Sequence, residues 1–140
     1  KYRHAHSKIE NTDDNWPVYR YADCLLLLAE CLVEQGRAGD AAPYVNQVRA
    51  RAGLPAVTTI NAEVVANERR HELAFENHRW YDLLRTGKAI EVMTAYGKCF
   101  KTINTELHER TYQIKPEYLL YPIPYNELQL NDQLKQNPGY

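Results

Sequence analysis

Cysteine is scarce in this sequence, which excludes a small domain held together by disulfides. Its three cysteines are odd in number and widely spaced, whereas a disulfide framework needs more numerous, paired thiols. Cys24 and Cys31 lie seven residues apart, and on one helix this separates them by roughly 10 Å, too far for a disulfide. We therefore expect both side chains to pack in the core, and we assign no role to Cys99.

Long apolar runs and an excess of one charge are also missing. The longest apolar run, CLLLLA at residues 24–29, is far shorter than the roughly 20 residues of a membrane-spanning helix. The 17 lysines and arginines nearly balance the 18 acidic residues. This balance does not indicate a nucleic-acid partner or a charged membrane surface.

The chain begins without an initiator methionine or a signal sequence. We therefore expect it to be a segment of a longer precursor. Its 140 residues suffice for one domain with a single core, or for part of a larger domain.

Familiar catalytic and metal-binding motifs are absent from the sequence. It has no Gly-rich phosphate loop, no Ser-centred elbow and no Cys beside a base. His4 and His6 lie in a polar stretch, and His71 and His78 are too far apart to share an ion, so surface or packing roles are expected. A glycosidase-type pair of carboxylates stays a minor alternative, because 18 acidic residues supply such pairs by chance. We predict no catalytic residue, no metal site and no cofactor.

Helical patterns dominate the sequence that is present. Residues 17–35, with a proline at the start and Gly36 as a stop, predict a helix whose wide apolar arc should be buried on more than one side. A second helix is predicted over residues 41–53, after a short link in which Asp40 can cap it. So short a link makes the pair an antiparallel hairpin that is similar to one tetratricopeptide unit. Such units need neighbours, so we expect further helical repeats from upstream sequence or from another chain.

A third helix is predicted to follow the hairpin. Thr58, Thr59 or Asn61 can cap it, and its pattern runs to about Asn77. One or two short helices should follow over residues 79–97.

The remaining signals come from glycine and proline. A break is predicted at Thr86 and Gly87, and a stop at Gly97. Residues 98–117 then predict a long irregular connection, where mobility or function is expected. The proline-rich residues 118–131 predict an extended segment with a short helical turn near residues 126–128.

These elements predict an all-α fold with a tetratricopeptide-like helical hairpin, further helices and an irregular, extended C-terminal segment. Residues 1–15 form a polar lead-in, residues 16–97 the helical part, and residues 98–140 the irregular connection and the extended segment.

Charge is concentrated in the stretch ERRHELAFENHRWYDLLRTGK, residues 68–88. Its glutamates recur every four residues and form one acidic stripe on a helix. Pairs at i,i+3 within the helix contribute only ~0.3–0.5 kcal/mol when exposed. We therefore expect partial burial against the preceding hairpin, with ligand contact and catalysis as minor alternatives. The hairpin offers as partners Asp23, Glu30, Arg49 and Arg51. The predicted structural ion-pair scaffold consists of Glu68, Arg69, Glu72, Glu76 and Arg79.

The sequence is rich in tyrosine, and flat aromatic faces are used to bind sugar rings or bases. Tyr19, Tyr21 and Tyr44 lie in the predicted helical part and are better explained by packing. The candidates for ligand contact lie in or beside the irregular connection, and are Tyr96, Phe100 and Tyr112.

Four blocks in order carry a resemblance to a known family. They are NWPVYRYADCLLLLAECLVEQG, AAPYVNQVRARAGLP, ERRHELAFENHRWYDLLRTGK and LYPIPYNELQLNDQLKQNPGY. Together they resemble the C-terminal portion of the SusD/RagB family of outer-membrane nutrient-binding lipoproteins, over roughly residues 15–140. His71, where the family pattern commonly repeats Arg, and Asn77, where Gly is common, are small departures.

The resemblance implies a mostly α-helical, non-enzymatic protein built on tetratricopeptide-like helix pairs. Such proteins are lipid-anchored on the extracellular face of the Bacteroidetes outer membrane. They form a lid on a SusC-like TonB-dependent transporter and capture glycans or peptides for import. The lipidated cysteine would lie upstream of Lys1, and membrane contact would come only through that anchor. The family's ligand-contacting residues lie largely outside the four blocks, so none is carried over.

Two other classes stay open on the residues alone. One is a tetratricopeptide-like scaffold that binds a protein or peptide through its concave face. The other is a small hydrolase.

Overall fold

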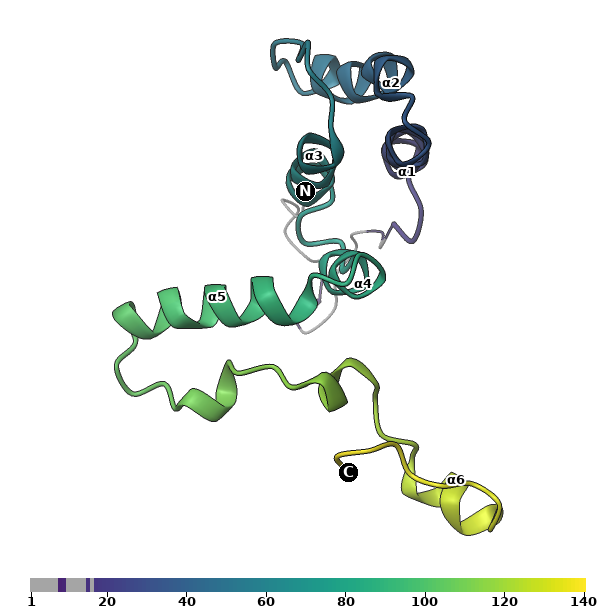
Figure 1. The fold of residues 1–140 in the computed structure, drawn as a ribbon, viewed down its shortest axis with the longest axis vertical. Coiled ribbons are helices and arrows are strands. Elements are labelled where there is room, and N and C mark those ends of the chain that lie inside the picture. The colour runs from purple at the N-terminus through teal and green to yellow at the C-terminus, as the bar shows by residue number, and fades with distance from the viewer. Residues whose placement is uncertain (1–7, 10–14, 16) are drawn as a thin grey trace. The chain divides into compact units, whose positions relative to one another are not determined.

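The computed structural model describes residues 8–9, 15 and 17–140 (Figure 1). These residues form six α-helices and two short 3₁₀-helices, with no β-strand among them. The predicted all-α fold is confirmed. The chain divides into two compact units, Lys1–Arg79 and Trp80–Tyr140. Most of the predicted polar lead-in, together with His4 and His6, lies outside the described residues.

The first unit is built on a helical hairpin of α1 (Tyr21–Glu34) and α2 (Ala38–Arg51). Gly36, with φ +73°, turns the chain between them, in the left-handed conformation that glycine adopts without strain. Helix α1 begins four residues later than predicted, because the chain is still extended at Arg20 (φ −131°, ψ 153°). Helix α2 begins earlier than predicted, so Asp40 lies in its first turn and is not its cap.

A single apolar core joins the hairpin to α3 (Ala62–Glu72), which packs on α1 and also contacts α2. Leu26, Val45 and Val65 are its largest fully buried side chains, one from each helix. Ala29 and Ala41 are also completely buried, and their small side chains let α1 and α2 approach closely.

Helix α1 is buried on one side only, and the prediction of a core position for its cysteines was wrong. Cys24 and Cys31 are both exposed, as are Leu27 and Leu28. Helices α2 and α3 cover one face of α1, and at ~3.6 residues per turn these four residues fall on the other face.

Helix α3 has the predicted cap but ends earlier than predicted. The Asn61 side chain accepts a 2.8 Å hydrogen bond from the amide of Val64. The helix ends at Glu72, because the following loop contains two left-handed residues, Phe75 (φ 67°) and Asn77 (φ 64°). Asn77 stands where the family pattern commonly has glycine, and asparagine is among the few other residues that tolerate this conformation.

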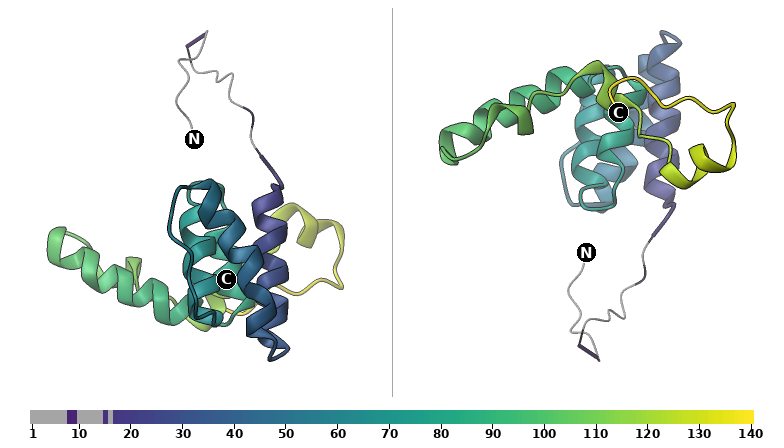
Figure 2. Two further views of the ribbon diagram at one scale, coloured as in Figure 1. Left: turned by 90° about the horizontal axis from the view of Figure 1, so that it is seen from above. Right: turned by 90° about the horizontal axis from the view of Figure 1, so that it is seen from below.

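The second unit, from Trp80 on, contains α4 (Arg79–Arg85) apart from its first residue, followed by α5 (Ala89–Ile103). Thr86 and Gly87 separate the two helices as predicted, with Gly87 at φ +69°. The predicted stop at Gly97 was wrong, because α5 continues through it for six more residues. The helical part therefore extends beyond residue 97. The chain then runs back along α5 (Figure 2), and the side chain of Tyr112 packs against Gly97.

The connection after α5 is less irregular than predicted, since it contains the 3₁₀-helices η1 (Glu109–Thr111) and η2 (Pro116–Leu119). The predicted short helix near residues 126–128 is present as α6 (Tyr125–Leu130). Hydrogen bonds join the extended residues before α6 to the extended residues after it. The side-chain amide of Gln136 accepts from the amide of Ile123 at 2.8 Å and donates to its carbonyl at 2.9 Å.

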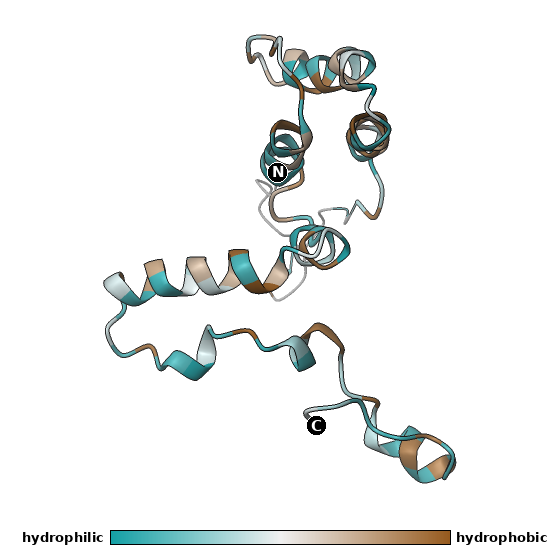
Figure 3. Ribbon diagram, in the orientation of Figure 1, coloured by the Kyte–Doolittle hydropathy of each residue, from teal (hydrophilic) through white to brown (hydrophobic). Residues whose placement is uncertain are grey.

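Hydrophobic positions are spread over several helices (Figure 3). Within the part of the chain that the structure describes, no helix combines the length and apolar character needed to cross a membrane.

Candidate functional site

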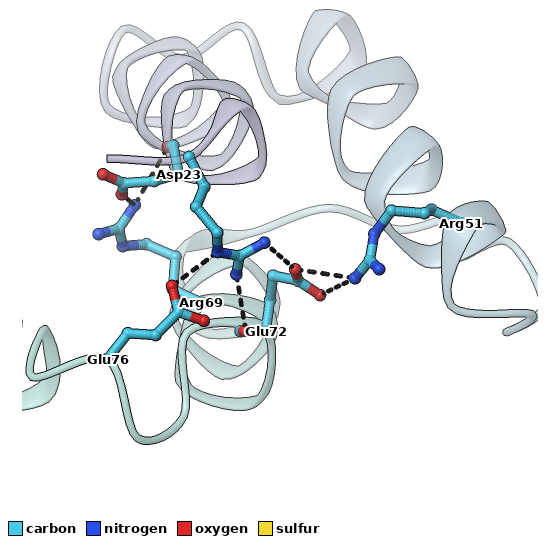
Figure 4. Close-up of polar contacts among 6 residues, drawn as sticks. Asp23, Arg51, Arg69, Glu72 and Glu76 are labelled. Carbon is cyan, nitrogen blue, oxygen red and sulfur yellow. Dashed lines mark hydrogen bonds and ion pairs between the residues drawn. The ribbon is translucent and has the colours of Figure 1, made fainter. Parts of the chain in front are cut away.

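Four residues of the predicted scaffold, Glu68, Arg69, Glu72 and Glu76, form ion pairs within the first unit. We call these residues and their partners the interhelical charge cluster, and its members are Arg20, Asp23, Arg49, Arg51, Glu68, Arg69, Glu72 and Glu76. Its pairs join α3 and the loop after it to α1, to α2 and to the extended residue before α1. Figure 4 shows six of these residues converging on the end of α3.

The most buried pair joins α3 to α1. Nη1 of Arg69 donates to Oδ1 of Asp23 at 2.8 Å, and the two side chains are only 4% and 6% exposed. Nε of Arg69 also lies 4.0 Å from a carboxylate oxygen of Glu30. Replacing a charge pair buried this deeply with apolar residues is often neutral, whereas removing one partner is strongly destabilising.

Glu72 connects three segments of the chain. Its carboxylate accepts from Arg20 at 2.9 Å and from Arg51 of α2 at 2.7 Å. Arg20 also donates to the backbone carbonyl of Glu72 at 3.0 Å and to the carboxylate of Glu76 at 2.6 Å. The guanidinium of Arg20 therefore holds both the last residue of α3 and the loop after it.

The two glutamates beside Arg20 stabilise its charged form. The pKa of its guanidinium is raised, chiefly by the hydrogen bond to Glu76; partial burial opposes this, and Glu72 raises it further. Arginine is ionised at any physiological pH, and these contacts stabilise the charged form further.

The outer edge of the cluster joins α2 to α3. Nη1 of Arg49 donates to Glu68 at 2.7 Å, and its Nε donates to the carbonyl of Pro55 at 2.8 Å. The loop between α2 and α3 is fixed a second time by Asn46, whose side-chain amide exchanges two hydrogen bonds with the backbone of Val57. Arg49 and Asn46 of α2 thus hold the loop that leads to α3, and Arg49 also holds α3 itself through Glu68.

The structure therefore gives Glu68, Arg69 and Glu72 partners on other helices, and it pairs Glu76 with Arg20, just before α1. Asp23, Glu30, Arg49 and Arg51 of the hairpin supply four of them. Arg79 is the first residue of α4, and its part in the scaffold stays a prediction. Arg20 was missed, because the sequence predicted it inside the first helix and gave no sign that the loop after α3 would bring Glu76 to it.

The carboxylates of the cluster are paired with arginines from other segments of the chain. Asp23, Glu68, Glu72 and Glu76 each accept a hydrogen bond from an arginine. This chemistry favours a structural role for the four acids.

The predicted aromatic candidates lie in the second unit, and two of them form a pair. The rings of Tyr96 and Phe100 on α5 stack with centroids 6.2 Å apart and an angle of 12° between their planes. The two residues are 61% and 40% exposed. Ile103, one turn further along, is 79% exposed and extends the same apolar stripe.

Tyr112 has a different setting from the other two candidates. It is only 9% exposed, and its side chain fills the space that Gly97 leaves open on α5. Neighbouring residues on a helix point about 100° apart, so this contact lies to one side of the exposed pair. The structure therefore brings Tyr96 and Phe100 together and gives Tyr112 a packing position.

Metal ligands do not gather in the described residues, where no group of three or more His, Cys, Asp or Glu side chains could hold an ion.

Comparison with known proteins places this geometry in a family. The model of the SusD family matches residues 1–140, the whole chain. The chain belongs to the SusD family. Among curated relatives, it is 34% identical to the SusD-like protein P38 of Formosa agariphila, over 100% of the chain and 27% of that protein. It is 30% identical to the starch-binding protein SusD of Bacteroides thetaiotaomicron, over 97% of the chain and 23% of that protein.

Solved structures of SusD-like proteins agree with this assignment. A laminarin-binding SusD-like protein superposes with a TM-score of 0.73 and 40% identity, over 93% of this chain and 24% of that one. Surface glycan-binding protein A from Bacteroides uniformis superposes with a TM-score of 0.72 and 30% identity, over 91% of this chain and 28% of that one. The chain thus spans about a quarter of the length of the relatives that it matches.

Proposed function

We propose that this SusD-family chain is part of a glycan-binding protein that captures an oligosaccharide without cleaving it. The observation that carries the proposal is the exposed, stacked pair of Tyr96 and Phe100 on α5. Among the relatives, the structure titled a laminarin-binding SusD-like protein and the protein named starch-binding SusD support a carbohydrate ligand over a peptide.

The chemistry of the pair suits a sugar. The face of an aromatic ring carries partial negative charge, and the axial C–H groups of a pyranose ring present an apolar, weakly positive face. Two nearly parallel rings offer neighbouring surfaces of this kind, and the helix holds their backbone positions fixed. Because the rings already contact each other, little side-chain entropy is lost when a ligand covers them.

Family membership extends the proposal to the cellular location of the whole protein and to its partner. The whole protein would sit on the extracellular face of the outer membrane through an upstream lipid anchor. It would deliver its glycan to a SusC-like TonB-dependent transporter. A tetratricopeptide-like scaffold that binds other proteins, and a SusD-like protein that binds peptides, are the alternatives.

Affinity electrophoresis of the natural full-length gene product tests the ligand class. Native gels cast with laminarin, with starch or with a tryptic peptide mixture distinguish the alternatives by retardation relative to an inert protein. Retardation by at least one glycan, with no reducing sugar released during incubation, supports the proposal. Retardation by the peptides alone supports the peptide-binding alternative, and release of sugar would contradict the absence of catalysis.

A further inference from the structure

The loop between α3 and α4 carries an exposed aromatic ring on a strained backbone. We call residues 73–78 the α3–α4 loop. Phe75 in this loop has a left-handed backbone, with φ 67°, and its side chain is 83% exposed. A left-handed conformation brings the Cβ too close to the neighbouring carbonyl oxygen, and it is a genuine outlier for a bulky residue. An aromatic residue in this conformation therefore calls for an explanation.

Arg20 holds the chain on both sides of Phe75. Its guanidinium donates to the backbone carbonyl of Glu72 at 3.0 Å, just before the loop, and to the carboxylate of Glu76 at 2.6 Å, within the loop. The side chain of Glu76 is only 2% exposed, and Figure 4 shows Glu72 and Glu76 at this end of α3. Strained residues that the surrounding structure fixes in this way cluster at ligand-binding and active sites.

The neighbours of the ring along the chain are polar or buried. Arg70 and His71, in the last turn of α3, are exposed. Leu73, the other large apolar residue of the α3–α4 loop, is 4% exposed. The centre of a protein–protein interface gathers several apolar anchors, whereas this loop exposes one. A single ring near guanidinium and imidazole groups suits a pyranose, which has an apolar C–H face and a rim of hydroxyls.

We propose that Phe75 is a second glycan contact of this protein, in the first unit, whereas the pair of Tyr96 and Phe100 lies in the second. The ring stacks on the apolar face of one pyranose unit. The left-handed backbone then has a role, because it directs the ring to solvent while Leu73 of the same loop stays in the core. This inference rests on the proposed function, since it takes a glycan to be the ligand.

Aromatic and aliphatic substitutions at Phe75 separate sugar stacking from packing. Phe75→Leu removes the ring and keeps an apolar side chain, while Phe75→Trp keeps an aromatic face. Retardation in native gels cast with graded amounts of laminarin or of starch gives the dissociation constant of each full-length variant. We expect F75L to bind the retarding glycan about fivefold more weakly than the wild type, through the loss of one aromatic contact. F75W should bind within about twofold of the wild type.

Two controls accompany these variants. Tyr19→Leu makes the same kind of change at an aromatic residue that is 81% exposed in the same unit, and it should leave the affinity unchanged. The thermal midpoint of full-length F75L should equal that of the wild type, because an exposed ring adds little to stability.

Four outcomes would overturn the Phe75 contact and leave the proposed function intact. They are equal affinity of F75L and the wild type, equal weakening by F75L and Y19L, equal weakening by F75L and F75W, and a lower thermal midpoint of F75L. The last would show that the ring packs inside the full-length protein. A wild type that neither glycan retards would instead contradict the proposed function, and this contact with it.

Discussion

Arg69 of α3 and Asp23 of α1 form a charge pair that is almost completely buried, 46 residues apart in the sequence. Removing one member leaves the other charged in the interior, which typically costs about 3–5 kcal/mol, whereas replacing both with apolar residues is often nearly neutral. We therefore expect Arg69→Leu alone to lower the free energy of unfolding by about 3 kcal/mol. The double variant Asp23→Leu, Arg69→Leu should recover most of this loss. Urea unfolding of the four proteins of this cycle measures it, and additive losses would show that the two charges are independent.

The two arginines that share Glu72 should contribute unequally. The Arg20 side chain is 26% exposed and bonds to Glu72 and Glu76, while Arg51 is 63% exposed and bonds to Glu72 alone. Arg20→Ala should cost about 2 kcal/mol, since it removes a partner from two buried carboxylates. Arg51→Ala should cost less than about 1 kcal/mol, because solvent screens the exposed pair. Equal shifts in the urea midpoint would contradict this ranking.

Gly97 and Gly39 form a matched pair of helical glycines with opposite expected effects. A Cβ at Gly97 would lie 2.6 Å from Cγ of Tyr112, whereas one at Gly39 would meet no atom within 4 Å. Gly97→Ala should lower stability by about 1–3 kcal/mol through overpacking. Gly39→Ala should raise it by up to about 1 kcal/mol through helix propensity. Thermal unfolding followed by circular dichroism measures both, and a stabilising G97A would show that Tyr112 does not pack there.

The side chain of Gln136 should protect the backbone of Ile123. Because prolines flank Ile123, its amide is the one backbone donor of that tripeptide, and Gln136 accepts from it at 2.8 Å. Gln136→Leu removes the acceptor, so hydrogen exchange at this amide should accelerate about tenfold for a lost bond of ~1.4 kcal/mol. Gln136→Glu keeps an acceptor and should preserve most of the protection. Equal exchange in both variants would contradict the contact.

The sequence predicted the presence of the helices well, because caps, glycines and apolar spacing are local signals. It predicted several boundaries wrongly, because they depend on contacts that are distant in sequence. Gly97 resembles a helix stop, yet in the structure the missing side chain makes room for Tyr112. The apolar pattern of α3 continues beyond Glu72, but two left-handed residues end the helix and carry Glu76 back to Arg20.

The candidate sites, like the helices, were predictable where local spacing determines them and unpredictable where distant contacts do. Spacing alone indicated that the glutamates of α3 need cations, and the hairpin arginines were evident candidates. Arg20 was not, since it reaches Glu72 from 52 residues away. For the aromatics, tyrosine content suggested three candidates, but burial separates the exposed pair of Tyr96 and Phe100 from Tyr112. The exposed thiols of α1 could not be foreseen, because the sequence does not show which faces of a helix remain uncovered.

Calorimetric titration of oligosaccharides of the glycan that retards the full-length gene product, into that protein and its double variant Tyr96→Ala, Phe100→Ala, tests the central claim most directly. The matched control is Tyr125→Ala, at a 70% exposed tyrosine outside the pair. We predict binding by the wild type and by the control, and affinity at least about tenfold weaker in the double variant, a loss of ~1.4 kcal/mol or more. Equal affinity in all three proteins would contradict the assignment of the glycan site to α5.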